Sequence, residues 1–220
     1  AGWLTARLSG AKAWLHIQDF EVDVAFRMGL MKGGLVQRVV LWLEGAILRR
    51  FDVTSSISER MLKKLSEKGV DKDRIRFFPN WVDISKISPL NEESPYRKEL
   101  GIPANAMVAL FSGSLGSKQG LMVIPETARL LRHRTDLFFV ICGDGVMKDE
   151  IEAATRDLPN VRLLPLQPFE RLNDLLGMAD VHLLPQSPEA EDLVLPSKLS
   201  GMLASGRPII ATSRPDTEIA

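Results

Sequence analysis

Apolar runs and helical patterns alternate regularly along the second half of the chain. The runs are short enough for buried strands and occupy residues 106–111, 137–142, 161–164, 181–184 and 208–211. Amphipathic helical patterns lie between them, near residues 121–132, 146–156, 169–178 and 197–204. Strands and helices in this order build parallel sheets with helices on both faces. We therefore predict a Rossmann-like α/β domain in this part of the chain.

The first part of the chain carries fewer elements of the same kind. Short strands are predicted at 13–18, 52–54 and 74–78. Ser56 and Glu59 have the spacing of a capping box, which predicts that a helix starts between the last two strands. We interpret this part as the end of a second α/β domain.

A long apolar stripe with helical spacing lies before the second of these strands. Its members recur every three or four residues, at Val36, Val40, Leu43, Ile47 and Phe51. Together with Trp42 and nearby arginines, such a helix could also rest on a membrane. We favour a face that packs into the core.

A polar connection divides the chain. Residues 84–103 are rich in serine, proline, asparagine and glutamate, which predicts a boundary between domains at 1–86 and 87–220. The first domain has 15 Lys and Arg against 10 Asp and Glu, and the second has 13 against 18. The basic part could face an anionic surface. A chance imbalance of surface charges explains the difference equally well.

The composition excludes a wholly disordered chain, a collagen and a coiled coil. Hydrophobic residues make up 45% and charged residues 25%, as in ordinary globular domains. No apolar run reaches the roughly 20 residues that a membrane-spanning helix needs. The single cysteine, Cys142, allows no internal disulfide or zinc cluster and fits a reducing compartment. The chain starts without methionine and ends in mid-pattern, so we expect a fragment.

Two glycine turns follow predicted strands in the second domain. Residues 111–120 combine Gly113, Gly116 and Gly120 with Lys118, a composition suited to phosphate oxygens, although it matches neither common nucleotide-binding motif. A tight turn with a solvated lysine is the alternative. The second turn, at residues 143–145, is also typical of ordinary turns.

The stretch from 185 to 206 also points to anion binding. Pro196 suits a first helical turn, so Ser197 and Lys198 would stand near a helix N-terminus. A lysine there opposes the helix dipole, at a cost of about 0.3–1 kcal/mol, which a bound anion would remove. A lysine that turns into water is the alternative.

The remaining reactive residues favour structural roles. We expect His182 and Cys142 to be packed in the core and His133 to lie at a helix end. His16, in a strand near Asp19, is the one histidine that merits a test. No metal-ligand spacing and no nucleophile–base set is recognisable.

Several motifs, in this order and spacing, resemble retaining glycosyltransferases of the GT-B fold, family four, and most closely the colanic-acid biosynthesis branch. The resemblance covers almost the whole chain and is carried by the segments 52–56, 61–69, 78–83, 111–116, 119–121, 142–145, 179–181, 196–199 and 206–208. It implies two Rossmann-like domains, with residues 1–86 the C-terminal portion of the acceptor-side domain and 87–220 a truncated donor-binding domain.

The resemblance also implies roles for individual residues. Lys118 and amides near Gly113, Ser114 and Gly116, with Gly143 nearby, would contact the diphosphate of a nucleotide sugar. Gln167 and Pro168 would lie near the base. The loop carrying Glu191, Asp192, Ser197 and Lys198 would hold the sugar and its phosphates, and Asp19 would face the acceptor. Lys118, Lys198 and Asp19 are the expected catalytic residues.

Two departures from the family pattern concern acidic and basic groups. Many relatives carry two glutamates eight residues apart, where this chain has Leu193 and Gly201. Sugar or ribose contacts would then come from Glu191, Asp192 or Lys198. The frequent acceptor-side histidine falls near Gln18, which cannot act as an acid or base.

The expected function is transfer of a hexosyl group, with retention, to a lipid-linked saccharide in exopolysaccharide synthesis. The donor would be GDP-fucose or a UDP-sugar, with no metal, cofactor or nucleic-acid partner, at the cytoplasmic face of the membrane. The alternatives are a UDP-sugar epimerase of the same fold and a non-enzymatic nucleotide-binding module. A fragment without a complete acceptor half is expected to have little activity.

Overall fold

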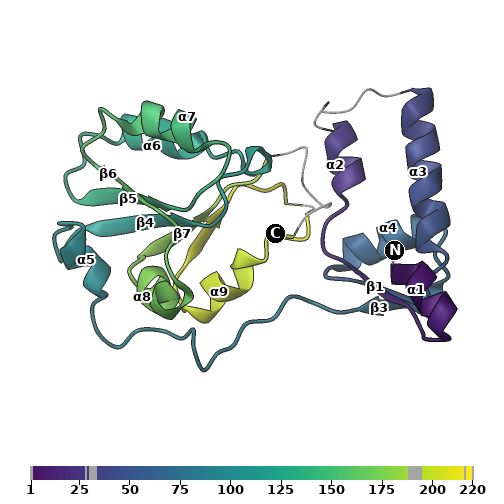
Figure 1. The fold of residues 1–220 in the computed structure, drawn as a ribbon. Helices are drawn as coiled ribbons and strands as arrows, with labels where there is room; N and C mark the ends of the chain where they lie inside the picture. Colours follow the sequence, from purple (N-terminus) through teal and green to yellow (C-terminus); the bar gives the residue numbers. More distant parts are fainter. Residues whose placement is uncertain (1, 28, 30–33, 188–194, 216, 220) are drawn as a thin grey trace. The chain divides into compact units, whose positions relative to one another are not determined.

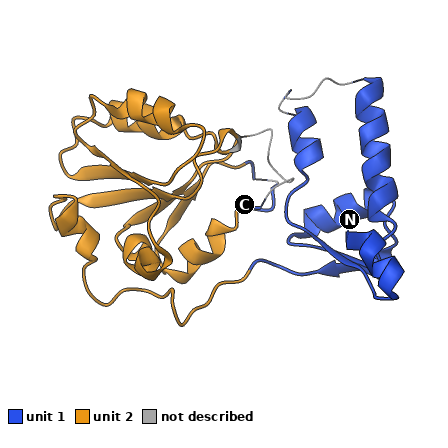
Figure 2. Ribbon diagram, viewed as in Figure 1, with its two compact units in different colours: residues 1–80, 188–195, 214–220 blue, residues 81–187, 196–213 orange. Residues whose placement is uncertain are grey.

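The structure is a computed structural model that describes residues 2–27, 29, 34–187, 195–215 and 217–219. Its chain forms two compact units (Figure 2). Unit 1 comprises residues 1–80 with 188–195 and 214–220, and unit 2 comprises 81–187 with 196–213. The main division thus falls after Asn80, close to the boundary that the sequence suggested at 86.

Unit 2 is built on a five-stranded parallel sheet in the order β6-β5-β4-β7-β8 (Figure 1). Its strands are β4 (Met107–Ser112), β5 (Leu137–Cys142), β6 (Val161–Leu164), β7 (Val181–Leu184) and β8 (Ile209–Ala211). The chain adds β5 and β6 on one side of β4, then returns to add β7 and β8 on the other. This reversal creates a switch point beside β4, where open parallel sheets hold their ligands.

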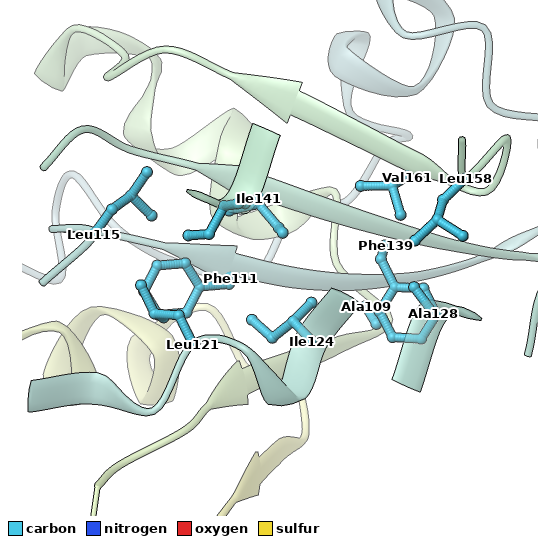
Figure 3. Close-up of a cluster of buried hydrophobic side chains, with 11 residues drawn as sticks. Ala109, Phe111, Leu115, Leu121, Ile124, Ala128, Phe139, Ile141, Leu158 and Val161 are labelled. Carbon is cyan, nitrogen blue, oxygen red and sulfur yellow. The ribbon is translucent and has the colours of Figure 1, made fainter. Parts of the chain in front are cut away.

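Both faces of this sheet are covered, because side chains alternate along each strand. Phe111 and Ile141 point into one core layer with α6 (Val123–Leu130) and α7 (Lys148–Thr155), drawn in Figure 3. Leu110 and Val140 point into the other layer, with Tyr96. That layer also involves α5 (Pro95–Glu99) and α8 (Leu172–Gly177), while α9 (Lys198–Ala204) links β7 to β8. The α/β class predicted from the sequence is confirmed.

A buried arginine ties the start of unit 2 to its sheet. Arg97 is 8% exposed and donates to the carbonyls of Ala106, at 2.7 Å, and Met178, at 3.1 Å. Its guanidinium also lies 2.6 Å from Oδ2 of Asp180, which accepts the amide of Val108 at 2.7 Å. One ion pair therefore joins α5, β4 and the turn before β7.

Unit 1 has a three-stranded parallel sheet in the order β1-β2-β3. The strands are β1 (Trp14–Ile17), β2 (Val53–Ser56) and β3 (Ile75–Phe77). The helices are α1 (Gly2–Ser9), α2 (Glu21–Arg27), α3 (Leu35–Leu48) and α4 (Glu59–Glu67). The core of the unit is formed by buried residues of β2–α4, α2 and the C-terminal end of α3, among them Phe20, Val24, Leu48, Met61 and Leu65.

The helix after β2 starts where the sequence predicted it, but with a different cap. Ser58 is the N-cap, and its Oγ accepts the amide of Met61 at 3.3 Å. Ser56 is still in β2, where its hydroxyl donates to the carbonyl of Ile17 at 2.8 Å. The capping box at Ser56 was therefore wrong, because strand pairing holds that residue in the sheet.

The expectation that the stripe of α3 faces the core was also wrong. Within α3, Gly45 and Leu48 are buried, whereas Val36, Leu43 and Ile47 are 57%, 46% and 55% exposed. Val40 and Phe51, the other two members of the stripe, are half-buried, and the described core of unit 1 takes only Leu48 from α3. Among the described residues, no helix has the length and apolar character needed to cross a bilayer.

We predict that Arg97→Ala lowers the free energy of unfolding of unit 2 by about 2–4 kcal/mol, because Asp180 and two carbonyls lose their partner. Urea unfolding followed by circular dichroism measures the change. Arg134→Ala, which breaks an exposed pair with Asp136, is the matched control and should leave the midpoint nearly unchanged. Equal effects of the two variants would contradict this account of Arg97.

Candidate functional site

A cavity of about 460 Å³ opens at the carboxyl end of the unit 2 sheet, beside the switch point. It is bounded by the ends of β4 and β5, the loop after β6, α8, the start of α9 and the first residues of the unit. The residues that line it are Trp81, Val82, Asp83, Ile87, Ser112, Gly113, Cys142, Leu166, Gln167, Phe169, Leu172, Leu175, Leu176, Ser197, Lys198, Ser200 and Gly201.

Lys198 is the cation of this cavity. Its Nζ lies 4.0 Å from the centre of the Phe111 ring and 3.3 Å from Oε1 of Gln119. Burial lowers the pKa of Lys198 to about 8, because the charged form loses water. Among the described residues, no carboxylate forms an ion pair with it. An ammonium held in this way favours a bound anion.

Two glycines make room for the lysine. A Cβ on Gly113, whose φ is +138°, would lie 3.0 Å from Nζ of Lys198. A Cβ on Gly143 would lie 1.9 Å from the carbonyl oxygen of Gly113. The ends of β4 and β5 can therefore approach each other, and Lys198 can lie along the backbone, only because both positions lack side chains.

Some amides of the glycine turn are already engaged. The amide of Gly113 donates to the carbonyl of Cys142 at 2.9 Å, and that of Leu115 donates to Asp144 at 2.8 Å. Within the described structure, the amides of Ser114 and Gly116 have no such bond. An anion at this turn would therefore use those two amides and not that of Gly113.

A short chain of hydrogen bonds fixes the loop after β6. The hydroxyl of Tyr96 donates to Oε1 of Gln167 at 2.8 Å, and Nε2 of Gln167 donates to the carbonyl of Pro165 at 2.8 Å. The thiol of Cys142 reaches the same carbonyl at 3.3 Å. Burial raises the pKa of Cys142 to about 11 and also raises that of Tyr96, so both groups remain protonated donors.

The structure brings four of the predicted site residues to this cavity: Gly113, Gln167, Ser197 and Lys198. Ser114 and Gly116 lie in the adjoining turn, and Pro168 is the N-cap of the 3-10 helix η3 (Phe169–Arg171). Gly143 instead lines a separate, smaller cavity of about 150 Å³ with Leu115 and Lys148.

The other predicted site residues either lie outside what the structure describes or belong to unit 1. The backbone of Lys118 belongs to the 3-10 helix η2 (Ser117–Gln119), while its side chain lies outside what the structure describes. Glu191 and Asp192 also lie outside the described residues. Asp19 belongs to unit 1, between β1 and α2. The roles of these residues stay predictions.

Sequence reasoning missed the wall formed by residues 81–83 and Ile87. The sequence marks residues 81–83 only as part of the family segment 78–83, and the wall carries no glycine turn or basic group that would indicate a site. Tyr96 was missed as well, because its role depends on a contact with Gln167, 71 residues away.

The histidines fit structural roles where the structure tests them. His182 is fully buried and pairs its Nε2 with Oγ of Ser205 at 2.9 Å, and burial lowers its pKa to about 4. This confirms the prediction of a packed histidine. His16 pairs its Nδ1 with Oγ of Ser55 at 2.9 Å and contacts the Phe78 ring edge-on.

Two family models cover most of the chain. The model for glycosyl transferases group 1 matches residues 106–220, and a glycosyl transferase 4-like domain matches residues 1–81. The chain belongs to the group 1 glycosyl transferases. This confirms the resemblance read from the motifs.

Relatives of this glycosyl transferase chain agree in sequence and fold. It is 40% identical, over 98% of its length, to the Escherichia coli colanic acid biosynthesis glycosyl transferase WcaI, of which it covers 54%. It is 23% identical, over 80% of its length, to the Streptococcus pneumoniae alpha-galactosylglucosyldiacylglycerol synthase, of which it covers 48%. Anabaena Alr3699/HepE, solved in complex with UDP and glucose, superposes with a TM-score of 0.74 at 16% identity, over 96% of this chain and 55% of that one. The chain thus spans about half the length of these relatives, and the expected GT-B-type fold is confirmed.

We predict that Gly143→Ala in this glycosyl transferase chain lowers the free energy of unfolding by about 3 kcal/mol, because the new methyl group overlaps the Gly113 carbonyl. Gly116→Ala should change it by less than about 0.5 kcal/mol, since the nearest atom to its Cβ is Oγ of Ser114 at 3.7 Å. Urea unfolding measures both. A neutral Gly143→Ala would show that the two strand ends are not closely packed.

Proposed function

We propose that this chain carries the donor site of a glycosyltransferase that uses a nucleotide sugar. The observation that carries the proposal is the partly buried ammonium of Lys198, which lines a cavity at the switch point of a parallel sheet. Much of the remaining lining is apolar and includes Leu166, Leu172 and Leu176. A flat base against the apolar side chains and a diphosphate at Lys198 would match this lining.

The chemistry of transfer requires an anion site more than a nucleophile. When the bond between the anomeric carbon and the phosphate oxygen breaks, the diphosphate keeps the electron pair and its charge increases. Lys198, with the amides of Ser114 and Gly116, would stabilise that charge. The acceptor oxygen then bonds to the anomeric carbon on the same face of the sugar that the diphosphate leaves. It gives its proton to the departing phosphate. Configuration is retained in this route without a covalent enzyme intermediate.

The acceptor in this proposal is a lipid-linked saccharide at the cytoplasmic membrane face. Support comes from the colanic acid biosynthesis relative and from a second relative named as an alpha-galactosylglucosyldiacylglycerol synthase. GDP-fucose and UDP-sugars are the proposed donors, and UDP bound to Alr3699/HepE supports the second class. Transfer itself is proposed for the whole protein, and donor binding for the 220-residue chain.

We predict that UDP binding weakens as the pH rises through about 8, because Lys198 loses its proton there. Lys198→Met should bind UDP about tenfold more weakly at pH 7, through loss of a charge-assisted contact, and should show little of this pH dependence. Isothermal titration calorimetry between pH 7 and 9.5 measures both effects.

Lys148→Met is the matched control, since this lysine lines the other cavity. It should keep the pH dependence of the unmodified chain. If Lys198→Met keeps that dependence as well, Lys198 does not hold the diphosphate.

The exposed stripe of α3 supports the membrane part of the proposal. Val36, Trp42, Leu43 and Ile47 are each more than 45% exposed, and Arg38 of the same helix is exposed as well. An exposed apolar face with a basic group on the other side of the helix is compatible with a helix that lies at a membrane surface.

We predict that Leu43→Gln reduces binding to vesicles of phosphatidylethanolamine and phosphatidylglycerol about fivefold, through loss of one apolar side chain from the interface. Cosedimentation measures the bound fraction. Leu130→Gln, at a 77% exposed position of α6, is the control and should have no effect. Equal binding by both variants would show that α3 does not contact the membrane.

A further inference from the structure

One wall of the unit 2 cavity is formed by the segment that precedes α5. We call residues 81–90 of this segment the strap. Its members that line the cavity are Trp81, Val82, Asp83 and Ile87. The strap belongs to no helix or strand, so the hydrogen bonds of regular secondary structure do not hold this wall in place. Its position depends on other contacts with unit 2.

A turn and one hydrogen bond to α8 order the strap. The carbonyl of Asp83 accepts the amides of Lys86 and Ile87, each at 3.0 Å. Ile87 is 3% exposed, whereas most of the strap residues before it are exposed. The amide of Ser88 then donates to Oδ1 of Asn173, in α8, at 2.9 Å. The strap is therefore folded by its own turn and attached to α8 by a single hydrogen bond at this point.

The end of the strap packs where two helices lack a side chain. A Cβ on Gly177, the last residue of α8, would lie 2.3 Å from Cδ1 and 2.4 Å from Cγ of Leu90. The Leu90 side chain thus occupies the space that a larger residue at 177 would fill. Similarly, a Cβ on Gly206, just after α9, would lie 2.9 Å from Cγ of Pro89. The absence of these two side chains allows the strap to lie against the ends of α8 and α9.

We propose that Leu90 and Asn173 are positioning residues of the cavity, which hold the strap against α8 and thereby raise the affinity for the nucleoside diphosphate of the donor. The role of both residues rests on the proposed function. Neither is among the residues that line the cavity, so each acts through the strap. A ligand that packs against the strap requires its docked position. Because the two equilibria are linked, the ligand in turn stabilises docking by the same factor.

Hydrogen–deuterium exchange measures docking of the strap directly. In the unmodified chain, saturating UDP should slow exchange of the amides of residues 86–88 about tenfold, because the bound ligand opposes local opening of the strap. Peptides from α6, which contributes no residue to the lining of this cavity, are the internal reference and should exchange at the same rate with and without UDP.

Gly177→Ala places a methyl group where the Leu90 side chain lies, while alanine favours a helix more than glycine does. The variant should fold, exchange the amides of 86–88 about fivefold faster and bind UDP about fivefold more weakly in calorimetry. Leu90→Ala should act in the same direction, because it removes the packing contact. The double variant should recover at least part of both losses, since Cβ of residue 90 lies 3.3 Å from the new methyl group and needs only a small shift.

Asn173 is tested by a second pair of variants. Asn173→Ala removes the acceptor of the Ser88 amide, so it should speed exchange of that amide and weaken UDP binding about threefold. Asn173→Asp keeps an acceptor oxygen and should retain the affinity within about twofold. Asn91→Ala, at an exposed position just after the strap, is the matched control and should change neither quantity.

The outcomes separate this role of the strap from the proposed function. If the unmodified chain binds neither UDP nor GDP, the proposed function fails, and the positioning role fails with it. If it binds UDP but exchange of residues 86–88 does not change, the positioning role alone is overturned. A loss of affinity in Gly177→Ala that Leu90→Ala does not relieve would show damage to α8 itself and would also overturn it.

Discussion

The position of Lys198 depends on the absence of side chains at the ends of two strands. Gly143 lets the end of β5 approach the carbonyl of Gly113, and Gly113 in turn leaves a channel along which the lysine stem lies. The ammonium then reaches the face of Phe111, where an aromatic ring partly replaces the water that burial removes. The position of the charge in the cavity therefore follows from close backbone packing. The contacts that bring the ends of β4 and β5 together also leave room for the lysine.

This arrangement works against the stability of the fold. A cation with little water and no carboxylate partner among the described residues is unfavourable, which the lowered pKa of Lys198 expresses. A neutral side chain would pack there at lower cost. An unfavourable, partly buried charge is typical of sites that bind a ligand of opposite charge, and it distinguishes Lys198 from the exposed lysines of the surface.

The sequence predicted the fold well, because alternation of apolar runs and helices is a local signal that survives in the structure. It also predicted that Gly113 and Lys198 lie near the carboxyl ends of these strands, where both line the cavity; their role in binding stays a prediction. It failed for α3, where helical spacing predicted the helix correctly but could not tell which face another part of the molecule covers. The wall from Trp81 to Asp83 and the bond from Tyr96 to Gln167 join positions far apart in the chain, so no local pattern marks them.

The single thiol of the chain can be used to measure local opening at the cavity. Cys142 is 2% exposed, lines the cavity and has a thiol that stays protonated well above neutral pH. Alkylating reagents attack the thiolate, so they can modify this residue only when the end of β5 opens transiently. The rate of alkylation therefore measures local opening at that edge of the sheet, without any label introduced by mutation.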